Sequence, residues 1–250
     1  MRKFLLCILS SLVAFSTLSF GQVGQKPGKG TKIDTIFANH TLPNSRFLRD
    51  AHFRFSMLIY DGHTYRSIKL LDEQLSIAGK RINIVQKLYD GISCNTDSVI
   101  VNSETLAPIE SYSNIPTARD SFKYKGNRIS GTITPIEKNK ANSVKKTDTS
   151  FSQPMFNGLA YAETYQSLTY KMGVPFYLAQ YVPGHNVNFE RVEYIKNEDV
   201  VLNGVSVRAI VVEIKKTSTI SIRCWLSAHT QELLKIEGKF PSFSYSLIRL

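Results

Sequence analysis

The sequence predicts a mainly β protein, an antiparallel meander interrupted by one helix near residues 155–172. Three observations lead to this prediction: apolar side chains alternate with polar ones over much of the chain, turns containing Gly separate the alternating runs, and a single segment has helical spacing. The 250 residues are 42% hydrophobic and 20% charged, which is typical of a globular protein and excludes an intrinsically disordered one.

The first 21 residues have the layout of a secretory signal peptide. Met1-Arg2-Lys3 gives a positive start, residues 5–18 are almost wholly apolar, and Ser19-Phe20-Gly21 places small residues before a cut. We therefore expect a periplasmic or secreted protein; an uncleaved N-terminal anchor is the alternative. Cys7 lies within the apolar stretch and does not follow the cut, so a lipoprotein is not expected.

The chain after the signal peptide is expected to form one domain. Residues 22–45 are predicted to be a flexible lead-in, because they begin with Gly, Lys and polar residues without periodicity. Residues 46–250 are predicted to be a single domain. A polar stretch at 138–150 is predicted to be a mobile loop or a poorly ordered connection.

Apolar residues alternate with polar ones in several runs, as half-buried strands require. Asn203-Gly204 separates two of these runs and predicts a tight hairpin, because both residues tolerate a positive φ. The alternating runs fall at 53–59, 82–88, 205–211, 220–226 and 243–247.

One segment breaks this pattern. Leu159, Ala162, Tyr165 and Leu168 follow the three-and-four spacing of a helix. Pro154 stands before the segment and Gly173 follows it, and these residue types are typical of helix starts and ends. The segment predicts one helix that covers the sheet.

The chemical motifs of enzymes and metal sites are missing from the sequence. There is no GxSxG, HExxH or phosphate-binding glycine loop, so we expect a protein that is not an enzyme and has no catalytic residue and no cofactor. His52 and His63, with Asp61 nearby, form the one cluster worth a metal hypothesis, but surface histidines are the preferred interpretation and no metal is expected. The acids Glu104, Glu110 and Asp120 are interpreted as solvated charges.

Two cysteines remain after removal of the signal peptide. Cys94 and Cys224 could form a disulfide in an oxidising compartment, or they could be two buried free thiols. The sequence does not decide between these alternatives.

The chain is basic, with a formal net charge of +11 that falls by two when Arg2 and Lys3 are removed. A positive net charge attracts a protein to anionic membrane surfaces, so transient contact with such a surface is an expected interaction. The charges are scattered along the sequence and do not form one patch. Nucleic acid is not an expected partner, because export separates the protein from it.

Several landmarks in the second part of the chain resemble a known family. They are Asp97-Ser98-Val99, Phe156-Asn157-Gly158, the Asn203-Gly204 hairpin, and Trp225 placed eight residues before Leu233-Leu234-Lys235. This order resembles a family of exported bacterial proteins that is catalogued as a domain of unknown function. That family is similar in fold to the Lol lipoprotein carriers, which implies an unclosed, strongly curved antiparallel half-barrel whose apolar mouth is covered by helix.

The resemblance implies a carrier or binding protein for a hydrophobic small molecule or lipid, such as an acyl chain held in the concave face. The same side chains could instead fill the core. The alternatives are a non-catalytic scaffold or interaction module that contacts an envelope protein through a sheet edge or through Lys145-Lys146, and an enzyme. No arginine is marked as a lipoprotein-release switch, a departure from the true carriers. The candidate ligand-lining residues are Phe53, Phe55, Met57, Ile82, Ile84, Leu168 and Trp225.

Overall fold

The computed structural model describes residues 33–91, 93–136, 144–182 and 187–250. The predicted signal peptide lies outside these residues. The described chain is mainly β, with sixteen strands in one sheet that is not closed into a barrel, as predicted.

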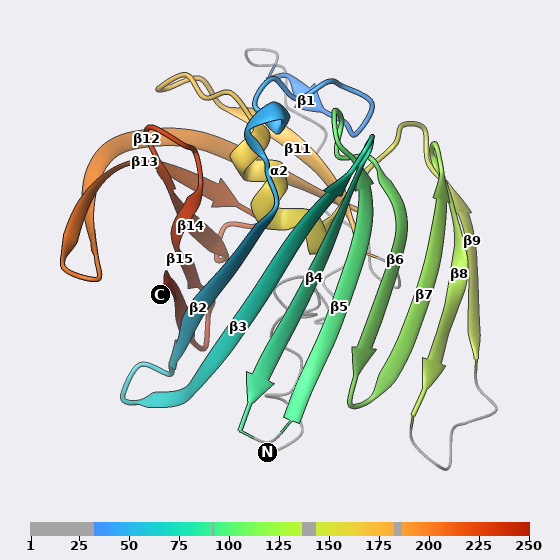
Figure 1. Ribbon diagram of the computed structural model, residues 1–250, viewed down its shortest axis with the longest axis horizontal. Coiled ribbons are helices and arrows are strands. Elements are labelled where there is room, and N and C mark those ends of the chain that lie inside the picture. Colours follow the sequence, from blue (N-terminus) through green and yellow to red (C-terminus); the bar gives the residue numbers. More distant parts are fainter. Residues whose placement is uncertain (1–32, 92, 137–143, 183–186) are drawn as a thin grey trace.

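The first half of the chain forms a continuous meander in which each strand pairs with the next (Figure 1). We call this half the N-terminal wall. Its strands are β2 (Ala51–Tyr60), β3 (Tyr65–Ala78), β4 (Arg81–Asp90), β5 (Ser93–Asn102), β6 (Pro108–Ile115), β7 (Ala118–Lys125), β8 (Arg128–Pro135) and β9 (Lys145–Ser150).

The second half forms the C-terminal wall, which faces the first across the interior (Figure 1). Antiparallel pairing of β16 with β2 joins the two walls, and the far ends of the sheet are β1 and β9. The strands are β10 (Phe156–Asn157), β11 (Phe176–Tyr181), β12 (Asn188–Leu202), β13 (Val205–Lys215), β14 (Ser221–Ser227), β15 (Leu233–Lys239) and β16 (Ser244–Arg249), with β1 (Thr35–Ile36) beside β11.

The hairpin between β12 and β13 turns at the predicted residues. Asn203 has a φ of 50° and Gly204 a φ of 79°. Two successive positive φ angles are those of a two-residue type I′ turn, whose twist matches that of the strands. The prediction is confirmed.

The helix is shorter than predicted. The helix α2 spans only Tyr161–Ser167, after the 3-10 turn η2 (Gly158–Ala160), so the expected range 155–172 is wrong at both ends. At the start, the Asn157 side chain accepts from the backbone N–H of Leu159 at 2.8 Å and caps η2. At the end, Asn44 donates from its backbone to the carbonyl of Ser167 and from its side chain to that of Leu168, which replaces a further turn.

Two segments expected to lack structure contain strands in the parts that the structure describes. The described part of the predicted 22–45 lead-in contains β1, and its Ala38 and Leu42 are buried in the core, so the domain begins before residue 46. The 3-10 turn η1 (Ser45–Phe47) follows. In the described part of the predicted 138–150 loop, β9 pairs with β8, and Arg128 and Asp148 form an exposed ion pair at 2.6 Å across the two strands.

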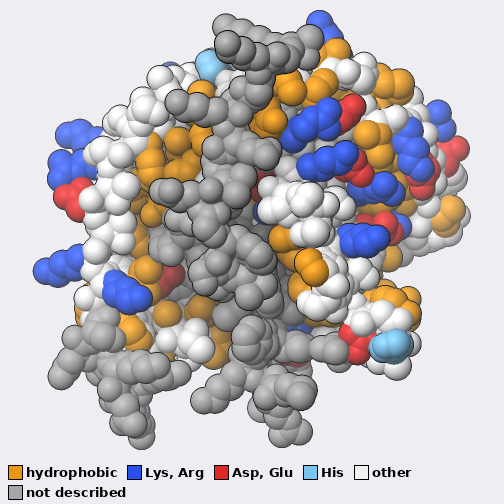
Figure 2. All heavy atoms as spheres, turned by 180° about the vertical axis from the view of Figure 1, so that it is seen from behind, with side chains coloured by type: hydrophobic (Ala, Val, Ile, Leu, Met, Phe, Trp, Pro, Cys, Tyr) orange, Lys and Arg blue, Asp and Glu red, His pale blue; other side chains and the backbone are white. Residues whose placement is uncertain are grey.

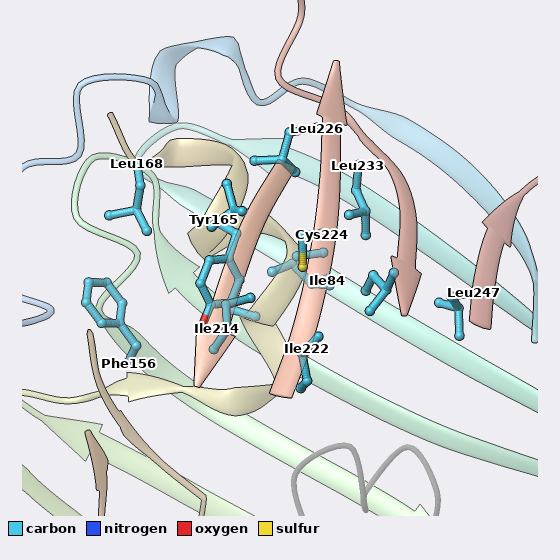
Figure 3. Close-up of a cluster of buried hydrophobic side chains, with 14 of the residues drawn as sticks. Ile84, Phe156, Tyr165, Leu168, Ile214, Ile222, Cys224, Leu226, Leu233 and Leu247 are labelled. Atoms are coloured by element: carbon cyan, nitrogen blue, oxygen red, sulfur yellow. The ribbon is translucent and has the colours of Figure 1, made fainter. Parts of the chain in front are cut away.

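The main core lies where α2 fills the space between the two walls. Tyr165 of α2 lies beside Ile214, with Leu168 and Phe156 on one side of it and Cys224 and Ile222 of the C-terminal wall on the other (Figure 3). A second buried cluster joins Phe122 and Ile129 of the N-terminal wall to Met155, Ala179 and Tyr181. The third cluster contains Trp225, Ala209, Val211 and Leu234.

Candidate functional site

A line of polar side chains crosses five neighbouring strands of the N-terminal wall on its concave face. Strand pairing places Glu73 opposite Gln86, Gln86 opposite Asp97, Asp97 opposite Ser113, and Ser113 opposite Asp120. Directly paired residues of neighbouring strands point to the same face of a sheet. We call these five residues the polar row.

Apolar side chains flank the polar row on both sides. Side chains two positions apart in a strand share a face, so Leu71 and Leu75 lie on either side of Glu73. On the next strand, Leu88 and Ile84 flank Gln86 in the same way, and all four leucine and isoleucine side chains are buried. The row is therefore a polar stripe in an apolar concave surface.

Hydrogen bonds link the members of the row in pairs and connect them to η2. The Gln86 amide donates to Glu73 Oε2 at 2.7 Å and to the carbonyl oxygen of Leu159 at 3.3 Å. The Ser113 hydroxyl donates to Asp97 Oδ1. These bonds fix the side chains of the row to the sheet and to the turn that precedes α2.

The helix adds a second carboxyl group beside the row. Glu163 of α2 is fully buried and interacts with Glu73. Burial and the neighbouring Glu73 charge raise the pKa of Glu163 well above its usual value. Burial also raises the pKa of Glu73 to about 6, although hydrogen bonds from Gln86 and Glu163 oppose this shift. One proton is thus favoured between the two carboxyl groups near neutral pH.

The other end of the row also holds two neighbouring acids. Burial raises the pKa of Asp97 despite the bond from Ser113. Burial, together with the charge of Asp97, raises the pKa of Asp120 to about 6. Asp120 Oδ1 and the amide oxygen of the buried Asn95 have no hydrogen-bond partner among the described residues. Asn95 lies two residues before Asp97 and so shares its face.

A different buried acid, Glu190 on β12, has an ion-pair partner and a hydroxyl donor within the protein. Lys216 Nζ lies 2.7 Å from Glu190 Oε1, and the Tyr165 hydroxyl donates to Oε2. The Lys216 ammonium also lies 5.6 Å from the ring centre of Tyr161. This site has a cation and a hydroxyl donor for its carboxylate, whereas Asp120 Oδ1 of the polar row and the amide oxygen of the neighbouring Asn95 have no donor among the described residues.

Most of the predicted ligand-lining residues belong to the main core. Phe55, Met57, Ile82, Ile84 and Leu168 are buried in the cluster that contains α2, and Phe53 packs against that cluster while remaining partly exposed. The structure brings these six residues together, in positions that also suit the core interpretation.

Trp225 does not join them, and its assignment to the same lining is wrong. Alternation on β14 directs Cys224 and Leu226 into the main core and Trp225 to the other face, where it packs in the third cluster. There, Lys235 Nζ lies 4.7 Å from the centre of the Trp225 ring.

The two cysteines do not form a disulfide, so that alternative is also wrong. Both are free: Cys94 is exposed on β5, whereas Cys224 is buried in the core under α2. Burial raises the pKa of the Cys224 thiol to about 12.

The histidine cluster does not assemble. His52 and His63 lie at opposite ends of β2, and His52 Nε2 contacts Asp72 at 2.9 Å while the backbone N–H of His63 donates to Asp61. No three His, Cys, Asp or Glu side chains in the described ranges are arranged to hold a metal ion.

Sequence reasoning missed the polar row and misjudged Asp120, which is half-buried opposite Ser113 and so is not simply a solvated charge. Glu104 and Glu110 are exposed, as expected. A signal for the row was present: Glu73 stands between Leu71 and Leu75 at positions that should face the core. That signal concerned one strand at a time. The alignment of the five polar residues follows only from the register between β3 and β7.

The comparisons with known proteins place the chain in a family. No curated protein matches it. None of the helices in the described part of the chain has the length and hydropathy that a membrane crossing requires. The model of a family described as "Protein of unknown function (DUF3108)" matches residues 74–248, which include four of the five row residues and strands β10 to β15 of the C-terminal wall. Because this match covers more than half of the sequence, the chain belongs to the DUF3108 family.

Proposed function

We propose that this protein is an exported, periplasmic carrier or binding protein that holds a hydrophobic ligand with an acyl chain on the concave face of its sheet. One observation carries the proposal: the curved sheet is not closed, and its concave face is apolar on both sides of the polar row. A curved apolar surface with a few convergent polar groups is the usual form of a site for a small hydrophobic molecule. The resemblance of the sequence to a family that is similar in fold to the Lol carriers favours the same class of ligand.

The position of α2 indicates which part of the concave face is available to a ligand. The helix and η2 cover the main core, and Leu159 of η2 reaches Gln86 of the row. Beyond the row, Ile133 of β8 pairs with Asp120 and is only partly buried. Figure 2 shows hydrophobic side chains on both sides of the molecule seen from behind, with Lys and Arg at the outer left edge and, mixed with Asp and Glu, across the right half. The acyl chain is placed on the part of the N-terminal wall that reaches from the row toward β8.

Native mass spectrometry tests the proposal. Full-length protein purified from its own cell envelope without detergent should carry an apolar molecule in a fixed stoichiometry, and organic extraction should remove it. The stripped protein should then bind a fluorescent fatty-acid probe. A folded protein that carries no such molecule and ignores the probe would contradict the proposal.

Two matched substitutions separate the concave face from the convex one. Ile133→Asn introduces an amide next to the row, and we expect it to weaken probe binding by about tenfold, which corresponds to about 1.4 kcal/mol. Ile68→Asn makes the same change at a side chain of β3 that is 72% exposed, so binding should be unchanged. Equal effects of the two substitutions would show that the probe does not bind on the concave face.

A further inference from the structure

We propose that the polar row recognises a positively charged headgroup, a primary or secondary ammonium, on the hydrophobic ligand. This inference rests on the proposed function, because the row supplies the polar part of a site whose remaining surface is apolar. It adds the chemical class of the headgroup and the residues that bind it, Asp97, Asp120 and Asn95.

The unpartnered atoms of this site are all hydrogen-bond acceptors. Asn95 is 7% exposed, and its amide oxygen has no partner among the described residues. Asp120 Oδ1 likewise has no donor within the described ranges. A buried polar atom without a partner is costly, so such atoms mark a place where a partner binds. A ligand that fits must bring donors, and an ammonium group brings two or three.

The charge of the site also favours a cationic headgroup. The row and its helix neighbour contain four carboxyl groups, Glu73, Asp97, Asp120 and Glu163, and none of them forms an ion pair within the described ranges. An anionic headgroup would be repelled by every ionised carboxylate, and a neutral one would gain no charge attraction. A cationic headgroup would gain both the attraction and the hydrogen bonds.

The lysines on the concave face of the N-terminal wall do not occupy the proposed headgroup position. Lys69 of β3 is buried on the same face, but its ammonium lies 2.9 Å from Asp90 Oδ2. Lys145 of β9 pairs with Ile133 at the level of the row, two strands from Asp120, and is exposed. Two strand spacings correspond to about 10 Å. Neither lysine replaces the headgroup donors.

Three probes with one alkyl chain test this inference: dodecylamine, dodecanoic acid and dodecyl glucoside. Isothermal titration calorimetry of the full, stripped chain at pH 8 measures each affinity below the micelle concentration of the probe. We expect dodecylamine to bind at least about tenfold more tightly than dodecanoic acid, with dodecyl glucoside between them.

The variant Asp97→Asn/Asp120→Asn removes two charges while keeping the size of both side chains and an acceptor oxygen for Ser113. We expect it to lose about tenfold in affinity for dodecylamine and to bind dodecanoic acid as well as, or better than, the native chain. The matched control Asp199→Asn removes a carboxylate from an exposed ion pair with Arg208 and should leave all three affinities unchanged. Circular dichroism confirms that each variant is folded.

The outcomes distinguish the two proposals. If none of the three probes binds, both the carrier function and the headgroup assignment are overturned. If all three bind with equal affinity, or if dodecanoic acid binds best, the carrier function stands and the headgroup assignment is overturned. A preference for dodecylamine that survives in Asp97→Asn/Asp120→Asn would also overturn the assignment of the row.

Discussion

Two buried acidic sites in the same interior are built in opposite ways. Glu190 of β12 has an ammonium group at 2.7 Å and a tyrosine hydroxyl donor, so its carboxylate is neutralised and hydrogen-bonded by the protein itself. Asp97 and Asp120 of the polar row repel each other, and Ser113 donates a hydrogen bond to Asp97. The Glu190 site holds its own cation, whereas these two acids form no ion pair within the described ranges.

This difference indicates two different roles for buried charge. A buried carboxylate with its cation in place fixes one arrangement of the core, and its loss leaves an uncompensated charge. A buried carboxyl group without a cation is held at a cost to stability, and such groups cluster where proteins bind ligands or carry out chemistry. We therefore expect the Glu190 site and the polar row to respond differently to substitution.

The largest effect is expected from removing the cation of the Glu190 site. Lys216→Met leaves Glu190 buried beside Tyr165 without its ammonium partner, and we expect a loss of about 3–5 kcal/mol in the free energy of unfolding. Urea denaturation measures this loss. The double variant Glu190→Gln/Lys216→Met should recover more than half of it, because no buried charge then remains. A loss below about 1 kcal/mol for the single variant would show that the pair is not what stabilises this site.

A somewhat smaller effect is expected in the core that both walls share. Ile84→Ala removes buried methyl groups beneath η2 and should lower the free energy of unfolding by about 2–4 kcal/mol. Binding of the fatty-acid probe should change much less than it does in Ile133→Asn, because Ile84 is packed by the protein. A variant of native stability with weakened probe binding would instead make Ile84 part of the ligand wall.

Removing a carboxyl group from the row should stabilise the protein, in contrast to the Glu190 site. The raised pKa of Glu73, about 6 in place of 4.5, means that the folded state binds its proton more tightly than the unfolded state does. This group therefore adds stability at acid pH that is lost as the pH rises from about 4.5 through about 6. Glu73→Gln keeps an acceptor for Gln86 and Glu163, so we expect it to be more stable than the native chain by about 1–2 kcal/mol at pH 8 and equal to it at pH 4.

Denaturant midpoints at the two pH values check this prediction. Asp199→Asn, at an exposed ion pair, is the control and should show no comparable gain at pH 8. A stability difference for Glu73→Gln that opens toward acid pH instead would show that Glu73 is stabilised as a carboxylate.

The smallest expected effect concerns the thiols. Because Cys94 is exposed and Cys224 is buried in the core, reductant should leave the unfolding midpoint unchanged. A thiol reagent should label Cys94 readily and Cys224 only after unfolding, since burial keeps the Cys224 thiol protonated. Rapid labelling of Cys224 in the folded protein would show that the core under α2 opens.

The strands could be predicted because they depend on local sequence patterns, whereas the site depends on contacts between residues far apart in the chain. Alternation and the Asn203-Gly204 turn are local, so they indicated strands and a hairpin correctly. The helix was predicted too long because its end depends on Asn44, more than 100 residues away, which occupies the carbonyl groups of Ser167 and Leu168. The same long-range contact orders the segment predicted to be a flexible lead-in.

The polar row depends on register, which the sequence of one strand does not contain. Asp97 and Asp120 are 23 positions apart in the chain, and each lies opposite Ser113 because of the turns between β5, β6 and β7. The assignment of Trp225 to the ligand lining was wrong for a local reason. On an alternating strand, Trp225 shares a face with Arg223, and Cys224 points to the other face.

The titration of Asp120 by carbon-13 nuclear magnetic resonance of its side-chain carboxyl group most directly tests the claim that the row awaits a cation. In the stripped protein its pKa should be about 6, and saturation with dodecylamine should lower it by more than one unit, because a bound ammonium stabilises the carboxylate. Saturation with dodecyl glucoside should not lower it. A pKa of Asp120 that stays at about 6 when dodecylamine is bound would contradict the claim.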